Sequence, residues 1–219
     1  MPELPKFPPS FFDRQDGSDD ARFYAIPRLV VHIDAATIAS LTQVYRELLP
    51  PGGEILDLMS SWVSHLPEEM HFGRVAGLGM NRVELERNPR LTEVVVHDLN
   101  REPELPFEDA SFDAVVNAVS VQYLTRPIAA FRSVARVLRS GGVHIVALSH
   151  RCFPTKAIRA WHALKPTERV PLVRTYFDLS EGYEDPTVLD RSPMGADPLW
   201  IVMARRRPAD EPSVAEQGD

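Results

Sequence analysis

Cysteine is almost absent from this 219-residue sequence, which contains only Cys152. A single cysteine excludes a disulfide within the chain and a zinc site built from several cysteines. Histidine is more frequent, but its spacing matches no metal-binding motif, so we expect the protein to bind no metal. The histidines considered as ligands are His65, His71, His97, His144 and His150.

Long hydrophobic runs and an excess of positive charge are missing as well. No apolar stretch approaches the roughly 18 residues of a membrane helix, and the N-terminal MPELPKFPPS lacks the pattern of a secretion signal. We therefore expect no membrane span and a cytoplasmic location. The formal net charge of -7 at pH 7 disfavours a nucleic-acid partner that is held by general basicity.

Glycine is scarce relative to proline, with 11 glycines against 20 prolines, and the prolines gather near the two ends. The content of 44% hydrophobic and 25% charged residues is typical of a globular protein. We expect residues 1–33 to form a leader or lid segment and residues 34–206 to form the folded domain. Residues 207–219 are expected to be a disordered tail.

Apolar segments of strand length alternate with segments of helix length through the folded domain. Short, almost wholly apolar strands indicate a parallel sheet that is covered on both faces. The pattern predicts an α/β fold: a doubly wound, mostly parallel, Rossmann-like sheet of seven strands with helices on both faces and an antiparallel C-terminal strand. Asp34 stands where the first long helix needs an N-cap. The expected strands are 54–60, 74–80, 92–100, 112–117, 143–149, 182–192 and 198–206, and the expected helices are 34–49, 81–88, 126–142, 154–164 and 167–179.

Four segments carry motifs in a recognisable order: EILDL at 54–58, VVVHDLN at 94–100, LPFEDASFDAVVNAVSVQYLTRP at 105–127 and FRSVARVLRSGG at 131–142. In this order they resemble the class I S-adenosylmethionine-dependent methyltransferases, in particular the small-molecule branch that includes the ubiquinone and menaquinone biosynthesis enzymes. The resemblance implies S-adenosylmethionine as the cofactor and a small organic molecule as the methyl acceptor. It leaves the oligomeric state open.

The resemblance also places cofactor contacts on residues at the ends of the predicted strands. Asp57 matches the acidic position that, in the family, orders the glycine-rich turn and the methionine part of the cofactor. Asp98 matches the acceptor for the adenine amino group, with the Leu99 backbone beside it. Asn117 follows the fourth strand, where cofactor contacts and substrate contacts meet.

The glycine-rich turn of the family is degenerate in this chain, because its glycines fall on Met59, Ser61 and Val63. Glycine suits that turn because the backbone approaches the ligand closely, often with a positive φ, which Met59 and Val63 do not readily adopt. We expect the hydroxyls of Ser60 and Ser61 to bind the carboxylate or ammonium group of the cofactor instead.

A second departure from the family concerns the ribose. The acidic residue expected at the end of the second strand falls on Met80 or Asn81. Asn81 offers one acceptor and one donor, whereas a carboxylate accepts hydrogen bonds from both ribose hydroxyls. Glu84 lies one helical turn further on and points less surely toward the site.

Further residues are candidates for catalysis and for the lid. His150 follows the fifth strand and is the first candidate for a general base, which is needed only if the acceptor is a hydroxyl. Tyr123 follows the fourth strand and is the second candidate, as a catalytic residue or a pocket wall. In the segment FYAIPRLVVHID at 23–34, Tyr24, Arg28 and His32 are expected to close over bound ligand, with Arg28 binding the cofactor by pairing a carboxylate. The alternative for this segment is a packed leader without contact to a ligand.

Other functions remain open at this point. The missing glycines are also compatible with a ligand-binding or scaffold protein that retains the fold and has lost catalysis. Asp57 and Asp98 could act as the acid and base of a hydrolase, although cofactor orientation explains both residues better. A Rossmann dehydrogenase is discounted because GLGMN at 77–81 is a poor fingerprint and follows the second strand rather than the first.

Overall fold

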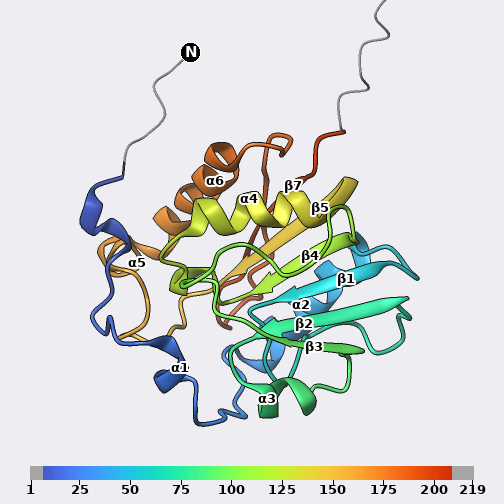
Figure 1. The fold of residues 1–219 in the computed structure, drawn as a ribbon, viewed down its shortest axis with the longest axis horizontal. Helices are drawn as coiled ribbons and strands as arrows, with labels where there is room; N and C mark the ends of the chain where they lie inside the picture. The colour runs from blue at the N-terminus through green and yellow to red at the C-terminus, as the bar shows by residue number, and fades with distance from the viewer. Residues whose placement is uncertain (1–6, 209–219) are drawn as a thin grey trace, which may run out of the picture.

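Seven strands form one sheet in the computed structural model, which describes residues 7–208 (Figure 1). The strand order is β3-β2-β1-β4-β5-β7-β6, and neighbours from β3 to β5 are parallel, whereas β7 is antiparallel to both β5 and β6. The predicted doubly wound sheet with an antiparallel C-terminal strand is confirmed. The strands are β1 Glu54–Leu58, β2 Arg74–Gly79, β3 Glu93–Val96, β4 Phe112–Ala118, β5 Leu138–Leu148, β6 Thr187–Asp190 and β7 Trp200–Arg205.

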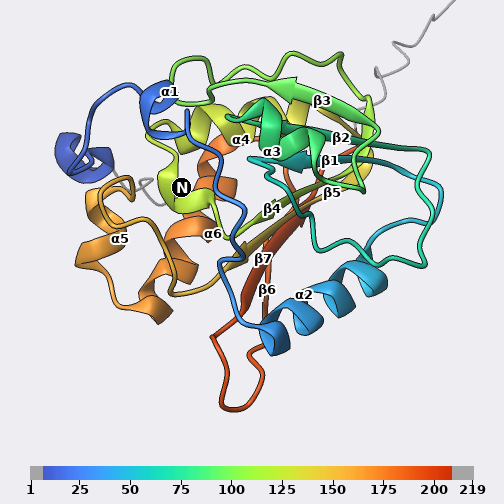
Figure 2. The ribbon, with the colours of Figure 1, turned by 90° about the horizontal axis from the view of Figure 1, so that it is seen from below.

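Helices cover both faces of this sheet (Figure 2). On one face, α2 packs its buried Leu41 and Tyr45 against the strands, and the Asp34 carboxylate caps this helix by accepting a hydrogen bond from Thr37 N at 2.9 Å, as predicted. On the other face, α4 and α6 bury Phe131 and Phe177. No helix within residues 7–208 is long and apolar enough to cross a lipid bilayer. The α-helices are α1 Asp20–Phe23, α2 Ala35–Leu48, α3 Arg82–Glu86, α4 Pro127–Val137, α5 Arg159–Ala163 and α6 Arg169–Ser180; the 3-10 helices are η1 Pro9–Phe12, η2 Val121–Tyr123 and η3 Pro166–Glu168.

The boundary between α4 and β5 differs from the prediction. The helix ends at Val137 rather than continuing to residue 142, and β5 begins at the next residue. Arg139, expected in the last helical turn, instead donates a hydrogen bond to Asp113 Oδ2 at 2.6 Å, and the same oxygen accepts from Glu54 N at 2.8 Å. This bond to the start of β4 draws residues 138–140 into the sheet. The spacing of apolar residues in the sequence cannot reveal such a contact.

The third strand is shorter than predicted, and this places two polar residues beside the sheet edge. β3 ends at Val96 rather than at residue 100. His97 N still donates to Gly79 O at 3.0 Å, after which the chain turns away. His97 and Asp98 therefore lie just outside the carboxyl end of the strand, where parallel sheets bind their ligands.

The leader segment is anchored to the domain by a buried group of charges. The Lys156 ammonium is fully buried, 3.0 Å from Asp20 Oδ1 and 3.2 Å from Asp16 Oδ2. Arg14 donates to both carboxylate oxygens of Asp20 at 2.9 and 2.8 Å. These pairs hold the described part of the leader against the loop that follows β5. Residues 1–6, and residues 209–219 of the predicted tail, lie outside the described part of the chain.

The core beneath α4 and α6 encloses a histidine. The fully buried His144 ring in β5 lies 4.7 Å from the Phe131 ring and 5.1 Å from the Phe177 ring, between centroids. Its Nδ1 is 3.3 Å from the hydroxyl of Tyr183, which donates to the Phe131 carbonyl, and its Nε2 has no partner in the described structure. Burial lowers the pKa of His144 to about 3, so the ring stays neutral in the folded protein.

This neutral histidine predicts a specific loss of stability in acid. The unfolded chain protonates His144 below about pH 6.5, whereas the folded protein resists protonation until about pH 3. Stability contributed by this residue therefore falls as pH falls through that window, by about 1.4 kcal/mol per pH unit. We expect His144→Phe to abolish this slope in urea unfolding measured from pH 7 to pH 4. His71→Phe at the exposed surface serves as the control, and parallel stability curves for wild type and His144→Phe would contradict the assignment.

Candidate functional site

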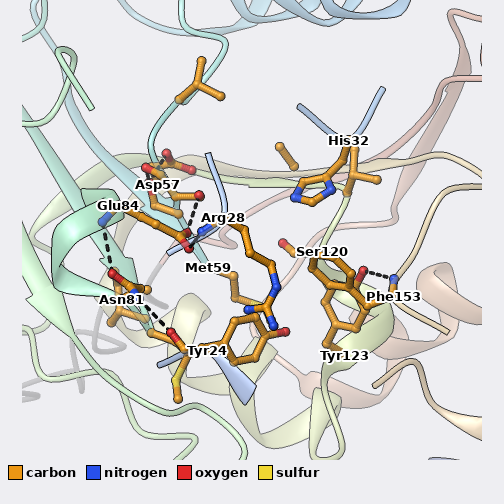
Figure 3. Close-up of a pocket in the computed structure, with 18 of the residues that line it drawn as sticks. Tyr24, Arg28, His32, Asp57, Met59, Asn81, Glu84, Ser120, Tyr123 and Phe153 are labelled. Atoms are coloured by element: carbon orange, nitrogen blue, oxygen red, sulfur yellow. Dashed lines mark hydrogen bonds between the residues drawn. The ribbon is translucent and has the colours of Figure 1, made fainter. Parts of the chain in front are cut away.

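A cavity lies at the carboxyl ends of the parallel strands, closed by residues 24–33, which we call the strap (Figure 3). The volume of the cavity is about 120 Å³. It lies where the strand order reverses between β1 and β4, as expected for an open α/β sheet. Its walls come from the segments that follow β1, β2, β3, β4 and β5, and from the strap.

The turn after β1 keeps a left-handed backbone although it contains no glycine. Met59 adopts φ 58°, contrary to the expectation that a methionine would not take this conformation readily. The following Ser60 N donates to Leu78 O at 2.8 Å, which ties the turn to β2. A glycine is needed instead on the opposite side, because a Cβ at Gly79 would collide with the Ser60 carbonyl oxygen. The two turns thus approach each other closely without glycine at position 59.

Asp57 is the charged residue at the floor of this turn. It is almost fully buried, and Ser60 Oγ donates to its Oδ2 at 2.5 Å. Burial raises the pKa of Asp57 to about 6, although hydrogen bonds from Ser60 and Ser64 oppose the shift. Ser60 therefore orients Asp57, while Ser61 donates to Glu84 Oε2 at 2.6 Å. Both predicted serines line the cavity, but their hydroxyls are already committed to carboxylates.

Backbone strain is concentrated around the cavity. Besides Met59, His65 at φ 55° and Val119 at φ 50° line it. Val119 is β-branched, and a β-branched residue in the left-handed region is a conformational outlier. Its N–H donates to Ala147 O at 2.9 Å, which helps to hold the chain in this state as it leaves β4. Such strain costs about 1–3 kcal/mol per residue and persists chiefly at functional sites.

The segment after β2 forms hydrogen bonds that hold the strap in place. Asn81 Oδ1 accepts from Val83 N and Glu84 N and so caps α3, while Asn81 Nδ2 donates to the carbonyls of Tyr24 and Ala25 at 2.7 and 3.3 Å. The buried Glu84 accepts from Arg28 N at 2.7 Å through Oε1. Asn81, which was predicted to bind the ribose, therefore has its side chain engaged in hydrogen bonds to the strap and to the start of α3. Glu84, which the sequence placed less surely, presents its carboxylate to the cavity (Figure 3).

Polar contacts hold the strap, because several of its apolar side chains bury little surface against the rest of the protein. Ile26 exposes 72% of its surface, and Val30 and Val31 each expose 50%. Besides the contacts from Asn81 and Glu84, Trp62 Nε1 donates to Val30 O at 3.0 Å. Residues from the turns after β1 and β2 thus close the cavity together.

The turn after β3 presents Asp98, Leu99 and Asn100 to the cavity. Asp98 Oδ1 accepts from Asn100 N at 2.9 Å and from Arg101 N at 3.3 Å, whereas its Oδ2 has no hydrogen-bond partner among residues 7–208. Asn100 Nδ2 donates to Asp20 Oδ2 at 2.8 Å and so connects this turn to the leader. Asp98 is therefore fixed in position with one oxygen free to accept. Met80 also lines the cavity, beside Asn81.

Tyr123 forms the wall that follows β4. Its hydroxyl accepts from Phe153 N at 2.8 Å, and the two rings are stacked with centroids 5.8 Å apart. Burial raises the pKa of Tyr123 to about 12, so the phenol stays protonated. Its own hydrogen has no acceptor in the described part of the chain, which leaves Tyr123 as a donor toward a ligand.

Two predicted site residues lie outside the cavity lining. His150 is exposed, and its Nε2 lies 3.5 Å from Asp197 Oδ1 beside the N-terminus of α2. Asn117 is buried behind the wall, where its Nδ2 donates to Leu58 O at 3.4 Å and its Oδ1 accepts from Ser120 Oγ at 3.2 Å. Asn117 thus supports the cavity from within the sheet, while His150 points to a different part of the surface.

The imidazoles that line the cavity are His32, His65 and His97 instead. Desolvation lowers the pKa of His32, opposed by Glu84, and burial lowers the pKa of His65 to about 4 with a smaller contribution from His32. Of these three histidines, only His32 was predicted from the sequence to contact a ligand, because it lies in a segment of mixed aromatic and basic residues. Phe153, five residues after β5, had no such signal. The cavity carboxylates form no metal cage, since no group of three possible ligands gathers anywhere in the described range.

Comparisons with known proteins agree with this architecture. A model of the methyltransferase domain family matches residues 64–146, well under half of the chain and beginning after the glycine-free turn. No curated protein matches the sequence.

Solved structures of low sequence identity share the fold. An S-adenosylmethionine-dependent methyltransferase from Mesorhizobium loti has 18% identity and a TM-score of 0.54, over 78% of this chain and 100% of that one. Phosphoethanolamine N-methyltransferase 2 from Haemonchus contortus, in complex with S-adenosyl-L-methionine, has 15% identity and a TM-score of 0.55, over 78% and 52%. The [4+2]-cyclase SpnF has 16% identity and a TM-score of 0.59, over 77% and 81%. The chain therefore has the fold of S-adenosylmethionine-dependent methyltransferases, and one protein with this fold is described as a cyclase.

The raised pKa of Asp57 predicts a stability cost at neutral pH. Stability from the protonated carboxyl is fully present below about pH 3.8 and is lost as pH rises to about 6, a loss of about 3 kcal/mol. We expect Asp57→Asn, which keeps the shape and an acceptor for Ser60, to be more stable than wild type at pH 7 and to lack this slope. Urea unfolding at pH 4 and pH 7 tests this, with the exposed Asp178→Asn as the matched control. A variant that is less stable at pH 7 would show that the carboxylate stabilises the turn.

The contacts of Asn81 predict that a carboxylate at this position releases the strap. Asn81→Asp keeps the α3 cap but replaces the donor to the Tyr24 and Ala25 carbonyls with an acceptor. Loss of these bonds should raise strap opening about tenfold or more. We expect faster amide hydrogen exchange across residues 24–31. Gln15→Glu adds the same charge to the leader at an exposed position and should leave exchange in the strap unchanged. Equal exchange in Asn81→Asp and wild type would mean that other contacts hold the strap.

Proposed function

We propose that this protein transfers a methyl group from S-adenosylmethionine to a small organic acceptor. The observation that carries the proposal is the placement of Asp57, Glu84 and Asp98. They come from β1, α3 and the turn after β3, and all of them line one cavity with a left-handed turn at Met59. Three carboxylates in a part-enclosed cavity favour a cationic ligand, and a sulfonium with an ammonium group fits that charge.

The polar groups of the cavity suit the parts of this cofactor. Asp98 Oδ2 is available to accept from an adenine amino group. Each Glu84 oxygen has one partner and can accept a second hydrogen bond, which suits ribose hydroxyls. Asp57 lies under the turn, where the methionine portion would bind. Gly79 lets the turn after β1 pack closely against the end of β2, which holds Ser60 in place beside Asp57.

When bound, S-adenosylmethionine supplies a methyl carbon on a sulfonium leaving group, so the chain has mainly to align two reactants and exclude water. The strap excludes water, because Asn81, Glu84 and Trp62 fasten it over the cavity. Tyr123 donates its hydroxyl hydrogen to the acceptor and orients it. A neutral imidazole at His32 can take a proton from a hydroxyl acceptor. We assign this role to His32 because His150 lies outside the cavity lining.

The acceptor class follows from the same cavity. Residues after β4 and β5 give it an apolar and aromatic wall, which suits a small organic molecule rather than a polymer. The net charge of -7 supports a partner other than nucleic acid. The proposal that the chain belongs to the quinone-biosynthesis branch rests on the motifs within residues 105–142. The proposal of a cytoplasmic location rests on the composition.

A second candidate function is a binding protein that uses the fold without methyl transfer. The observation in its favour is that Asn81 and the hydroxyls of Ser60 and Ser61 are occupied by internal hydrogen bonds. In that case the strap would be a permanent cover, and the cavity would hold another cation.

Titration calorimetry with S-adenosylhomocysteine and S-adenosylmethionine tests the proposal. We expect wild type to bind both, and Asp98→Ala to lose about tenfold or more in affinity, as for removal of a hydrogen bond to a charged group. Asp178→Ala, at an exposed position on α6, is the control and should bind as wild type does. Binding unaltered by Asp98→Ala would refute the adenine assignment. No binding by wild type at millimolar ligand would refute the transferase and favour the second candidate.

A further inference from the structure

The Arg28 side chain is a cation inside the cavity that forms no ion pair with any carboxylate of residues 7–208. Its guanidinium lies 4.2 Å from the ring centroid of Phe23, 5.5 Å from that of Phe153 and 5.9 Å from that of Tyr24. The side chain makes a single long hydrogen bond, from a terminal nitrogen to Ile26 O at 3.4 Å. Figure 3 shows it extending through the middle of the cavity from the strap. Aromatic rings fix its position but leave most of its N–H donors free.

The carboxylates around the cavity make their contacts with groups other than the Arg28 guanidinium. Asp20 is taken by Arg14 and Lys156, and Asp57 by Ser60. Glu84 accepts from the backbone N–H of Arg28, not from its guanidinium. Within residues 7–208 no carboxylate forms an ion pair with Arg28. An arginine with free donors, held in a cavity, is complementary to an anionic group on a ligand.

The position of the guanidinium distinguishes between the two ligands of the proposed reaction. The groups suited to adenine and ribose follow β3 and β2, on one side of β1. The Arg28 backbone is held by Glu84 after β2, but its guanidinium reaches Phe153, which follows β5 and stacks on Tyr123 after β4, on the other side of β1. Arg28 therefore lies on the side of the sheet where the methyl acceptor would bind.

We infer that the acceptor carries a carboxylate on an apolar body and that Arg28 recognises this carboxylate; the inference rests on the proposed function. A single cation and the Tyr123 hydroxyl match a monoanion better than a phosphate dianion, which usually takes several cations or a helix N-terminus. The apolar body would pack against Val30, Val31 and Ile33 on the cavity side of the strap. This replaces the expected pairing of Arg28 with the cofactor.

Titration with matched pairs of acids and amides tests the inference. The probes are benzoate against benzamide and hexanoate against hexanamide, added to the full-length protein alone and saturated with S-adenosylhomocysteine. We expect wild type to bind each acid about tenfold or more tightly than its amide, as a charged hydrogen bond provides. Arg28→Gln should remove this preference, and Arg28→Lys should restore part of it. Arg174→Gln, at an exposed position on α6, is the matched control and should keep the preference.

The outcomes separate this inference from the proposed function. Equal affinity for acid and amide in wild type, with S-adenosylhomocysteine bound normally, would overturn the inference and leave the transferase proposal intact. A preference for acids without any binding of S-adenosylhomocysteine would refute the transferase while supporting the carboxylate site. If Arg28→Gln weakens S-adenosylhomocysteine but not S-methyl-5′-thioadenosine, which lacks the carboxylate, Arg28 serves the cofactor and the inference is wrong.

Discussion

The hydrogen bonds from Asn81 and Glu84 to the strap are the interaction on which the cavity depends. Both residues lie at the start of α3, directly after β2, and both reach backbone groups of residues 24–28. The strap buries too little apolar surface to hold itself in place, as the exposure of Ile26 shows. Closure of the cavity is therefore a polar interaction between the leader and the second βα unit. A cofactor that competes for Glu84 would act directly on this closure.

The glycine-free turn shows that backbone conformation, rather than residue type, defines this part of the fold. Met59 takes the left-handed conformation that glycine takes most readily, and the energetic cost falls on the protein. Bonds from Ser60 to Leu78 and to Asp57 hold the turn in place. The side chain of Met59 then becomes part of the cavity wall, which a glycine would have left open.

The sequence predicted the sheet because its strands are short, apolar and punctuated by amphipathic helices, which is local information. It did not predict the end of α4, because the bond from Arg139 to Asp113 joins residues that are distant in sequence. Asp57 in β1 and Asp98 after β3 line one cavity, and their cofactor contacts stay a prediction. The strap contacts of Asn81 could not be predicted, since their partners lie 56 and 57 positions earlier. His150 was chosen for its place after β5, but the chain turns there toward Asp197.

The burial of Lys156 has a consequence for how the protein acquires its cavity. Its ammonium bonds to the Ser18 carbonyl, 138 positions earlier, and to Asp20 at the start of α1. The leader can therefore dock only after the chain has been synthesised past β5, although it is made first. Contacts of such long sequence separation form late, after most chain entropy has been lost. A nascent chain that already contains every cavity carboxylate would still lack an enclosed binding site until the loop at residue 156 has folded.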